Sequence, residues 1–385
     1  MKINTLSGDF DRTEFLQKYW QKEPVLLRGL FPNFVDPLSA EELAGCACEE
    51  QVESRVVTEF TAGDFALRSG PFEEKDFTSL PDSHWTLLVQ AMDQWFDELA
   101  DLRDEFDFIP SWRVDDVMIS FACDQAGVGP HFDNYDVFLL QGKGQRRWRL
   151  GQRCDDASPL REGSDLRLLD SFETSADFEL SAGDALYVPP RLAHWGTSIG
   201  DSLCYSIGFR APSNAEMIEG FSDFLIRRSV GEDRFEDPAP RLAADASEID
   251  PSALEPSFAR ILQQVNDPAL FRQWFGCHVT QPKYPELIEA LDEPSLQILE
   301  AALEDAQSVR QHPSSRFAHM RGDGETHLLF VNGSAAAFAS SKARDIGRLC
   351  SRDPIDGEEL DRFLDDAILR ELLLKLLEEG SLLLA

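Results

Sequence analysis

The feature that most constrains the fold is a run of short apolar segments between residues 114 and 209. Glycine, proline, asparagine and aspartate, which favour turns, separate each segment from the next. This spacing is typical of an antiparallel barrel or a double-sheet jelly roll, whose open end is a common place for a small-molecule site. Strands are predicted at residues 117–123, 137–140, 146–150, 166–169, 178–180, 185–188 and 203–209.

Two histidines and one aspartate stand beside these strands. His131 and Asp133 follow the glycine-containing turn at 127–130, and on extended backbone two residues at this spacing point to the same side. His194 follows the Pro-Pro corner that ends the strand at 185–188. Two imidazoles and one carboxylate that leave the other coordination positions open are the ligand set of non-haem Fe(II) oxygenases.

A simpler interpretation of the His-x-Asp motif is a loop histidine that is satisfied by an ordinary hydrogen bond. A His and an Asp also fall two residues apart by chance in many chains. The surroundings favour a metal site, because only His131 and His194, of seven histidines, lie at the ends of strand-like segments within one run of β signals.

Helical patterns precede the β-rich run. Ser39 stands just before two glutamates at the start of one such pattern and is suited to cap a helix. From residue 85 onward, apolar residues recur at intervals of three and four, which predicts a helix that packs on the core. Helices are predicted at 10–24, 37–48 and 85–106, and strands at 25–27 and 52–60.

After residue 212 the pattern becomes helical again. We interpret residues 213–281 as a helical element that packs on a second copy of the chain. Residues 282–385 combine helices with a hairpin, for which Asn332-Gly333 supplies the turn, and this predicts a winged-helix-like domain. The predicted parts are a helix near 217–225, a linker at 237–257, helices at 258–265, 268–275, 285–291 and 295–306, a hairpin at 328–338 and a final helix at 357–377.

The net charge of −34 constrains the partners of the chain. Such a surface repels nucleic acid phosphates and attracts basic proteins, although an adaptation for solubility would give the same figure. From residue 282 onward there are 11 Lys and Arg against 20 Asp and Glu, which argues against DNA binding. The absence of a signal-peptide pattern or a long apolar run, together with scattered cysteines, predicts a reduced, cytoplasmic protein without a membrane span.

Several linked motifs resemble one family. They are FLQKYWQKEPVLLRG, WRVDDVMISFA, GVGPHFDNYDVFLLQGKGQRRWRLG, GDALYVPPRLAHWG and YSIGFRAP, in that order between residues 10 and 212. In sequence and order they resemble the JmjC-type ribosomal oxygenases of bacteria. The resemblance implies an α+β multidomain protein with a double-stranded β-helix (jelly-roll, cupin-like) catalytic domain at 1–212, a helical dimerisation segment at 213–281 and an acidic winged-helix-like domain at 282–385.

The resemblance also implies the chemistry. Members of the family use Fe(II) and 2-oxoglutarate to hydroxylate a ribosomal protein, with release of succinate and CO2. For this chain the implied substrate is an arginine β-carbon in a basic protein of the large ribosomal subunit. By position, the implied metal ligands are His131, Asp133 and His194, and the cosubstrate would chelate the metal beside them.

In the family, a basic residue on the strand after the His-x-Asp hairpin binds the far carboxylate of 2-oxoglutarate. Strand alternation places Arg146 on the same face as Trp148 and Leu150, inside the barrel, and leaves Arg147 and Arg149 on the polar outer face. A guanidinium suits a carboxylate because it can donate two parallel hydrogen bonds. Ser120 matches a family position whose hydroxyl assists this carboxylate, but the strand pattern does not decide which way it faces.

Asp124 and Tyr135 flank the metal motif and are candidates for contact with the substrate guanidinium, although either residue suits a turn equally well. Four alternatives remain open at this point. The protein could hydroxylate a ribosomal histidine, could be another JmjC enzyme such as a lysine demethylase, or could be a zinc-dependent cupin isomerase. It could also be a non-catalytic acidic chaperone of a basic ribosomal protein.

Overall fold

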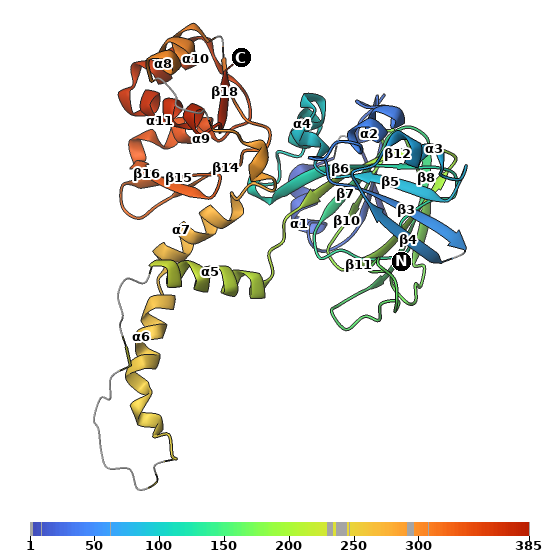
Figure 1. Cartoon of the computed structure of the whole chain (residues 1–385), viewed down its shortest axis with the longest axis horizontal. Coiled ribbons are helices and arrows are strands. Elements are labelled where there is room, and N and C mark those ends of the chain that lie inside the picture. The colour runs from blue at the N-terminus through green and yellow to red at the C-terminus, as the bar shows by residue number, and fades with distance from the viewer. Residues whose placement is uncertain are drawn as a thin grey trace. The chain divides into compact units, whose positions relative to one another are not determined.

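The computed structural model describes residues 3–384, except 9, 62, 229–233, 236–244, 246, 291–295 and 307. The chain divides into two compact units, Met1–Ala211 and Pro212–Ala385, which can be followed in Figure 1 by the colour that runs along the chain from blue to red. Each unit has its own buried apolar cluster. Within the described ranges, no helix has both the length and the apolar character needed to cross a bilayer.

The first unit contains a large and a small sheet. Apart from the parallel pair β1–β2, the paired strands are antiparallel, as expected for a jelly roll. The large sheet has the order β1 (Asn4–Ser7), β2 (Val25–Arg28), β10 (Ala185–Val188), β7 (Val137–Gln141), β12 (Ser202–Phe209), β6 (Val114–Ala122), β5 (Trp85–Val89), β3 (Ser54–Thr61) and β4 (Asp64–Ser69). The small sheet has the order β11 (Leu192–Ile199), β8 (Gln145–Arg153) and β9 (Ala176–Ser181).

The two sheets share one apolar cluster. Leu139 and Leu186 from the large sheet pack in it with Trp148, Leu150 and Leu180 from the small sheet. All five side chains are buried. The inward faces of β8 and β11 are therefore turned toward the large sheet, and polar side chains on those faces lie inside the barrel.

Short helices cover the large sheet on a second core that includes Phe15, Leu43 and Leu99. The predicted cap is confirmed, since the Ser39 hydroxyl accepts from the Glu42 N–H while the Glu42 carboxylate accepts from the Ser39 N–H. The helices are α1 (Arg12–Lys18), α2 (Ala40–Cys46), α3 (Glu74–Thr78) and α4 (Asp97–Asp104).

Two predictions in this unit were wrong, and one strand was missed. The helix predicted at 85–106 begins as strand β5, which lies between β3 and β6, and only α4 at its far end is α-helical. A buried strand and a buried helix both read as an apolar run, so periodicity could not separate them. Residues 166–169 make only a single bridge, Leu160 to Leu169, and strand β11 was not predicted.

The second unit consists of helices and two three-stranded sheets, with orders β17-β13-β18 and β14-β15-β16. Its hairpin prediction is confirmed, because Asn332 and Gly333 have φ of 47° and 83° between β15 and β16. Its elements are α5 (Asn214–Arg228), α6 (Glu255–Val265), α7 (Pro268–Val279), α8 (Leu296–Asp305), β13 (Ser308–Gln311), β14 (Phe317–Arg321), β15 (Thr326–Val331), β16 (Ser334–Ala339), α9 (Ala343–Leu349), β17 (Ile355–Asp356), α10 (Gly357–Asp365), α11 (Ala367–Glu378) and β18 (Leu382–Leu384).

The helix predicted at 357–377 is two helices, because Asp366 leaves helical backbone and its carboxylate caps the first turn of α11. Much of the predicted linker at 237–257 lies outside the described residues. Two helices were predicted next, at 285–291 and 295–306, and residues 291 and 295 also lie outside the described residues. A 3-10 turn, Pro285–Leu287, stands where the first of these two helices was predicted.

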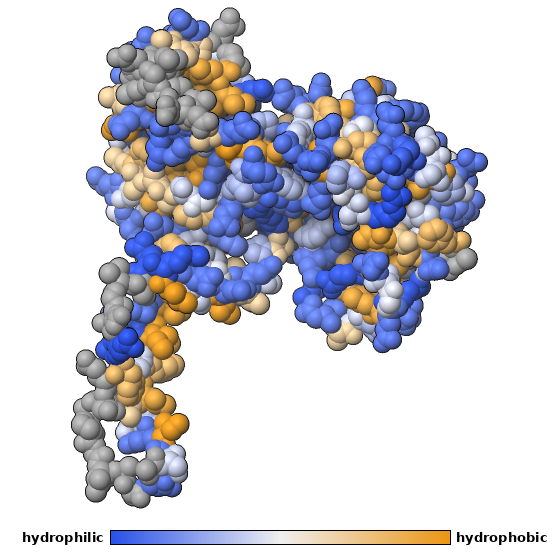
Figure 2. All heavy atoms as spheres, viewed as in Figure 1, coloured by the Kyte–Doolittle hydropathy of each residue, from blue (hydrophilic) through white to orange (hydrophobic). Residues whose placement is uncertain are grey.

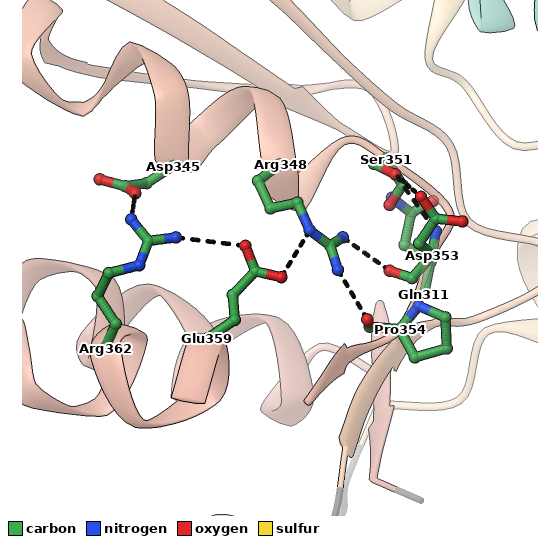
Figure 3. A network of polar contacts seen from close by, with 8 residues as sticks. All are labelled: Gln311, Asp345, Arg348, Ser351, Asp353, Pro354, Glu359 and Arg362. Carbon is green, nitrogen blue, oxygen red and sulfur yellow. Dashed lines mark hydrogen bonds and ion pairs between the residues drawn. The ribbon is translucent and has the colours of Figure 1, made fainter. Parts of the chain in front are cut away.

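Ion pairs join α9 to α10, as Figure 3 shows. Arg348 donates to the Glu359 carboxylate at 2.8 Å and to the backbone carbonyls of Asp353 and Pro354. Arg362 donates to Glu359 and to Asp345. These two arginines of the second unit are therefore neutralised by acids of the same unit.

Candidate metal centre

Two imidazoles and one carboxylate converge in the first unit. The Nε2 atom of His194 lies 3.5 Å from Oδ2 of Asp133, and that of His131 lies 3.9 Å from the same oxygen. One candidate ligand atom from each residue lies within 4.8 Å of the other two. In the part of the chain that the structure describes, no other His, Cys, Asp and Glu side chains form such a group.

Backbone pairing brings the three residues together. His131 and His194 form an isolated antiparallel bridge, with N–H to O distances of 3.1 and 2.9 Å. His194 lies within β11, whereas residues 131–133 are not part of a longer strand. Next to the bridge, the Arg191 N–H donates to the carbonyl of Asp133 at 2.7 Å, which holds the aspartate beside β11.

The hydrogen bonds of the two rings fix their tautomers. Nδ1 of His131 lies 3.0 Å from the carbonyl oxygen of Gly129, and Nδ1 of His194 lies 3.0 Å from that of Leu192. A carbonyl can only accept, so each Nδ1 carries a hydrogen, and the neutral form of each ring keeps its lone pair on Nε2. Metal-binding histidines typically show this arrangement, in which the second nitrogen donates to a carbonyl and orients the ring.

Burial keeps His194 neutral. Its side chain is 3% exposed, and this burial, together with the neighbouring His131, lowers its pKa to about 4, although Asp133 acts in the opposite direction. A neutral imidazole can bind a metal without first losing a proton. His194 is therefore able to bind a metal ion near neutral pH.

A buried guanidinium lies farther along β8. Arg146 is 6% exposed, and it donates to the Ser120 hydroxyl at 2.9 Å and to the Ser202 hydroxyl at 3.0 Å. Among the described residues no carboxylate pairs with it, and burial lowers its pKa. An isolated buried cation is costly, so this position is built to receive an anion.

The alternation predicted for β8 is confirmed. Arg147 is exposed on the outer face and pairs with Asp177, with Nε to Oδ1 at 2.8 Å. Arg149 stacks on Trp195, with its Cζ 3.6 Å from the ring centroid. Only the first arginine of the RRWR segment therefore points into the barrel.

The two candidate substrate contacts occupy different surroundings. Asp124 accepts from the Gly200 N–H at 2.8 Å, a contact that holds a turn and lowers the pKa of the carboxyl group. The charge of the neighbouring Asp133 carboxylate, followed by burial, raises the pKa of the Tyr135 phenol. Tyr135 is nevertheless 44% exposed, so it reaches from the metal group toward solvent.

Sequence reasoning missed Asp116. It is 2% exposed, lies on β6 at the even spacing that places it on the same face as Ser120, and accepts from the Gln90 side-chain amide at 2.8 Å. Its charge also contributes to the raised pKa of Tyr135, so the two groups are near each other. The signal was present in the VDDVMIS segment, because alternation back from Ser120 reaches Asp116.

Comparisons with known proteins agree with this geometry. Residues 101–217 match the JmjC domain, and residues 262–383 match the ROXA-like winged helix. The ribosomal protein uL16 3-hydroxylase of Escherichia coli is 41% identical over 284 residues, which cover 74% of this chain and 75% of that protein. A probable ribosomal oxygenase of Haemophilus influenzae is 31% identical, over 91% of this chain and 88% of its own length.

Solved structures give the same result. The crystal structure of E. coli YcfD has a TM-score of 0.86 at 34% identity and covers 98% of this chain and 99% of its own. A YcfD complex with cobalt and 2-oxoglutarate has a TM-score of 0.83 at 34% identity, over 97% and 98% of the two chains. Fold and site thus define a JmjC-type oxygenase. The chain belongs to the JmjC-domain ribosomal oxygenase family, as the motifs predicted, with the expected winged-helix domain.

Proposed function

We propose that this chain is an Fe(II)- and 2-oxoglutarate-dependent oxygenase that hydroxylates the β-carbon of an arginine side chain in the ribosomal protein uL16. One observation carries the proposal. The barrel that holds the converging His131, Asp133 and His194 side chains also holds Arg146, a buried cation with no acidic partner among the described residues.

The donor set fits Fe(II). Two neutral imidazoles and one carboxylate would hold the ion, and they leave positions for cosubstrate and O2. When bound, the ion supplies the oxidation of a substrate carbon by O2, coupled to conversion of 2-oxoglutarate into succinate and CO2. Structures of the relative YcfD with cobalt and 2-oxoglutarate, and with cobalt and succinic acid, support this chemistry.

The anion site fits the far carboxylate of 2-oxoglutarate. Arg146 would donate to that carboxylate, and the Ser120 hydroxyl, which now accepts from Arg146, can rotate to donate as well. His131 and Asp133 would flank the end of the cosubstrate that chelates the metal. Burial of Arg146 strengthens the ion pair, because little water competes with it.

The substrate is inferred from charge and from the relatives. The net charge of −34 would speed the encounter with a basic ribosomal protein. The phenol of Tyr135 and the carboxylate of Asp116, which lie near each other, suit the guanidinium of an arginine. Asp116 and Asp124 each accept one or more hydrogen bonds already, from Gln90 and from Gly200, and we prefer Asp116 for the acidic contact because it lies on the same face of β6 as Ser120.

The test is turnover by the purified full-length chain with Fe(II), 2-oxoglutarate, O2 and peptides of uL16. We expect succinate release and one added oxygen on an arginine, located by tandem mass spectrometry. The matched controls are Asp133→Ala, which removes one ligand, and a peptide with lysine in place of arginine. Oxygen on a histidine would support the histidine-hydroxylase alternative, and binding of uL16 without succinate release would support the chaperone.

We also propose that the chain is a homodimer through its helical segment at 213–281. Four apolar side chains of α6 follow the spacing of one helix face and are about half exposed or more: Phe258, Ile261, Leu262 and Val265. Figure 2 shows orange side chains along this helix. A second copy is the occupant that offers the same apolar stripe, as two-fold symmetry requires.

A further inference from the structure

The inner faces of β8 and β11 form three successive cross-strand rows. Leu150 pairs with His194, Trp148 pairs with Gly196, and Arg146 pairs with Ser198. The first row carries a metal ligand and the last carries the buried cation. Consecutive rows are about 7 Å apart along a strand, so the Trp148 row lies midway between the two ends of the site.

The middle row is built around one large side chain. Trp148 is 6% exposed, and its ring centroid lies 6.0 Å from that of His194. A Cβ atom on Gly196 would come within 2.7 Å of the Trp148 ring, so only glycine leaves the indole its place against β11. The Trp148 ring therefore occupies the space that a side chain at position 196 would fill.

The indole N–H has no acceptor among the described residues, although the Nε1 atom is buried. Buried donors are nearly always paired, and an exception inside a binding site points to a partner that arrives with the ligand. The neighbouring Arg146 guanidinium also lacks an acidic partner in the described chain. A donor without an acceptor and a cation without an acidic partner thus lie in adjacent rows on one face of β8.

We infer that the indole N–H of Trp148 donates to an oxygen of the cosubstrate. This inference rests on the proposed function, because it requires a 2-oxo dicarboxylate that reaches from the metal to Arg146. Such a molecule passes the Trp148 row and carries carboxylate and keto oxygens as acceptors. Trp148 is then a binding residue between the metal centre and the carboxylate anchor.

The test observes the indole N–H of Trp148 directly by NMR spectroscopy. The full-length protein is labelled with 15N at its seven tryptophans and loaded with Zn(II), which fills the metal site without turnover. Trp148→Phe identifies the Trp148 indole signal by its absence. On titration with 2-oxoglutarate we expect the Trp148 indole proton to move downfield, while the other six indole signals move little.

Affinity gives a second measurement. Trp148→Phe keeps an aromatic ring but removes the donor, so we expect the Kd for 2-oxoglutarate to rise about tenfold, with Zn(II) affinity unchanged. The matched control is Trp195→Phe, which makes the same change on the outer face of the same sheet and should leave both affinities unchanged. If Trp148→Phe does not fold, replacing each of the other six tryptophans in turn assigns their signals and leaves that of Trp148, whose shift in the wild-type spectrum then decides.

The outcomes separate the two proposals. An unmoved Trp148 signal, or an unchanged Kd in a folded Trp148→Phe protein, would overturn this inference and assign the N–H to a buried water. If the Zn(II)-loaded wild type binds no 2-oxoglutarate, the proposed function fails, and this inference fails with it.

Discussion

His131 and His194 exchange both of their backbone hydrogen bonds, each N–H donating to the carbonyl of the other residue. A pair of this kind fixes the separation of the two Cα atoms. The backbone of each residue is therefore held beside that of the other, and the two rings lie 4.3 Å apart at their centroids. The pairing thus brings together two side chains that are 63 residues apart in the sequence.

Replacing Arg146 with methionine should separate stability from function. The variant removes a buried cation that has no acidic partner in the described residues, so we expect the cosubstrate-free protein to be equally stable or more stable, by about 1–4 kcal/mol. Binding of 2-oxoglutarate should be lost. Urea unfolding and calorimetric titration measure the two effects, and Arg147→Met on the exposed face should change stability by less than about 1 kcal/mol. A marked loss of stability in Arg146→Met would contradict this account.

The pKa of His194 predicts a pH dependence of stability. Its folded-state pKa of about 4 lies below the ordinary value of 6.5, so between these values the unfolded chain binds a proton that the folded chain does not. The stability from this neutral imidazole is fully present above about pH 6.5 and is lost as the pH falls toward 4, by about 3 kcal/mol.

His194→Gln cannot take up this proton, so its stability should fall less between about pH 7 and pH 4. Chemical denaturation of the metal-free wild type and variant at both pH values measures the difference. His312→Gln, in the second unit, removes another histidine whose pKa is lowered by burial, so it measures the reduction in pH dependence that is not specific to the metal centre. Equal pH dependence in wild type and His194→Gln would show that His194 is not held neutral by burial.

The ion pair between Arg103 and Asp93 should be essential for folding of the first unit. Its two side chains are 4% and 3% exposed, Nη1 lies 2.6 Å from Oδ2, and the second Asp93 oxygen accepts from the Val117 N–H. Asp93→Ala leaves an unpaired amide and a buried guanidinium with only the partly exposed Asp104 as its acidic partner among the described residues, and we expect a loss of about 3 kcal/mol. Thermal unfolding measures it, with the exposed pair in Asp107→Ala as the control that should shift little. A shift equal to that of the control would show that the buried pair contributes nothing.

The α6 stripe predicts a change of oligomeric state. Ile261→Glu places a charge at the centre of the apolar face, so we expect a dimer in the wild type and a monomer in the variant by analytical ultracentrifugation. Glu255→Gln, at the first residue of the same helix, should stay dimeric. Wild-type protein that sediments as a monomer at micromolar concentration would exclude the proposed interface.

Sequence reasoning succeeded where one face of a strand is buried and the other is solvated. The alternation along β8 assigned Arg146 to the interior and Arg147 to the exterior, and both placements are confirmed. It failed at β5, where four of five residues are buried and the pattern carries no period. It also missed β11, the strand that carries His194. Two prolines precede this strand and Gly196 lies within it, and these residues are typical of turns. Local signals could not show that its register with β8 requires a glycine there.

The side chains assigned to metal, cosubstrate and substrate all lie between Asp116 and Ser202, within the unit that ends at Ala211. That unit has a hydrophobic interior of its own, separate from the one in the C-terminal half. Substitutions in the acidic C-terminal domain or in the α6 stripe can therefore change the charge and the assembly of the protein while the oxidative machinery is inherited intact.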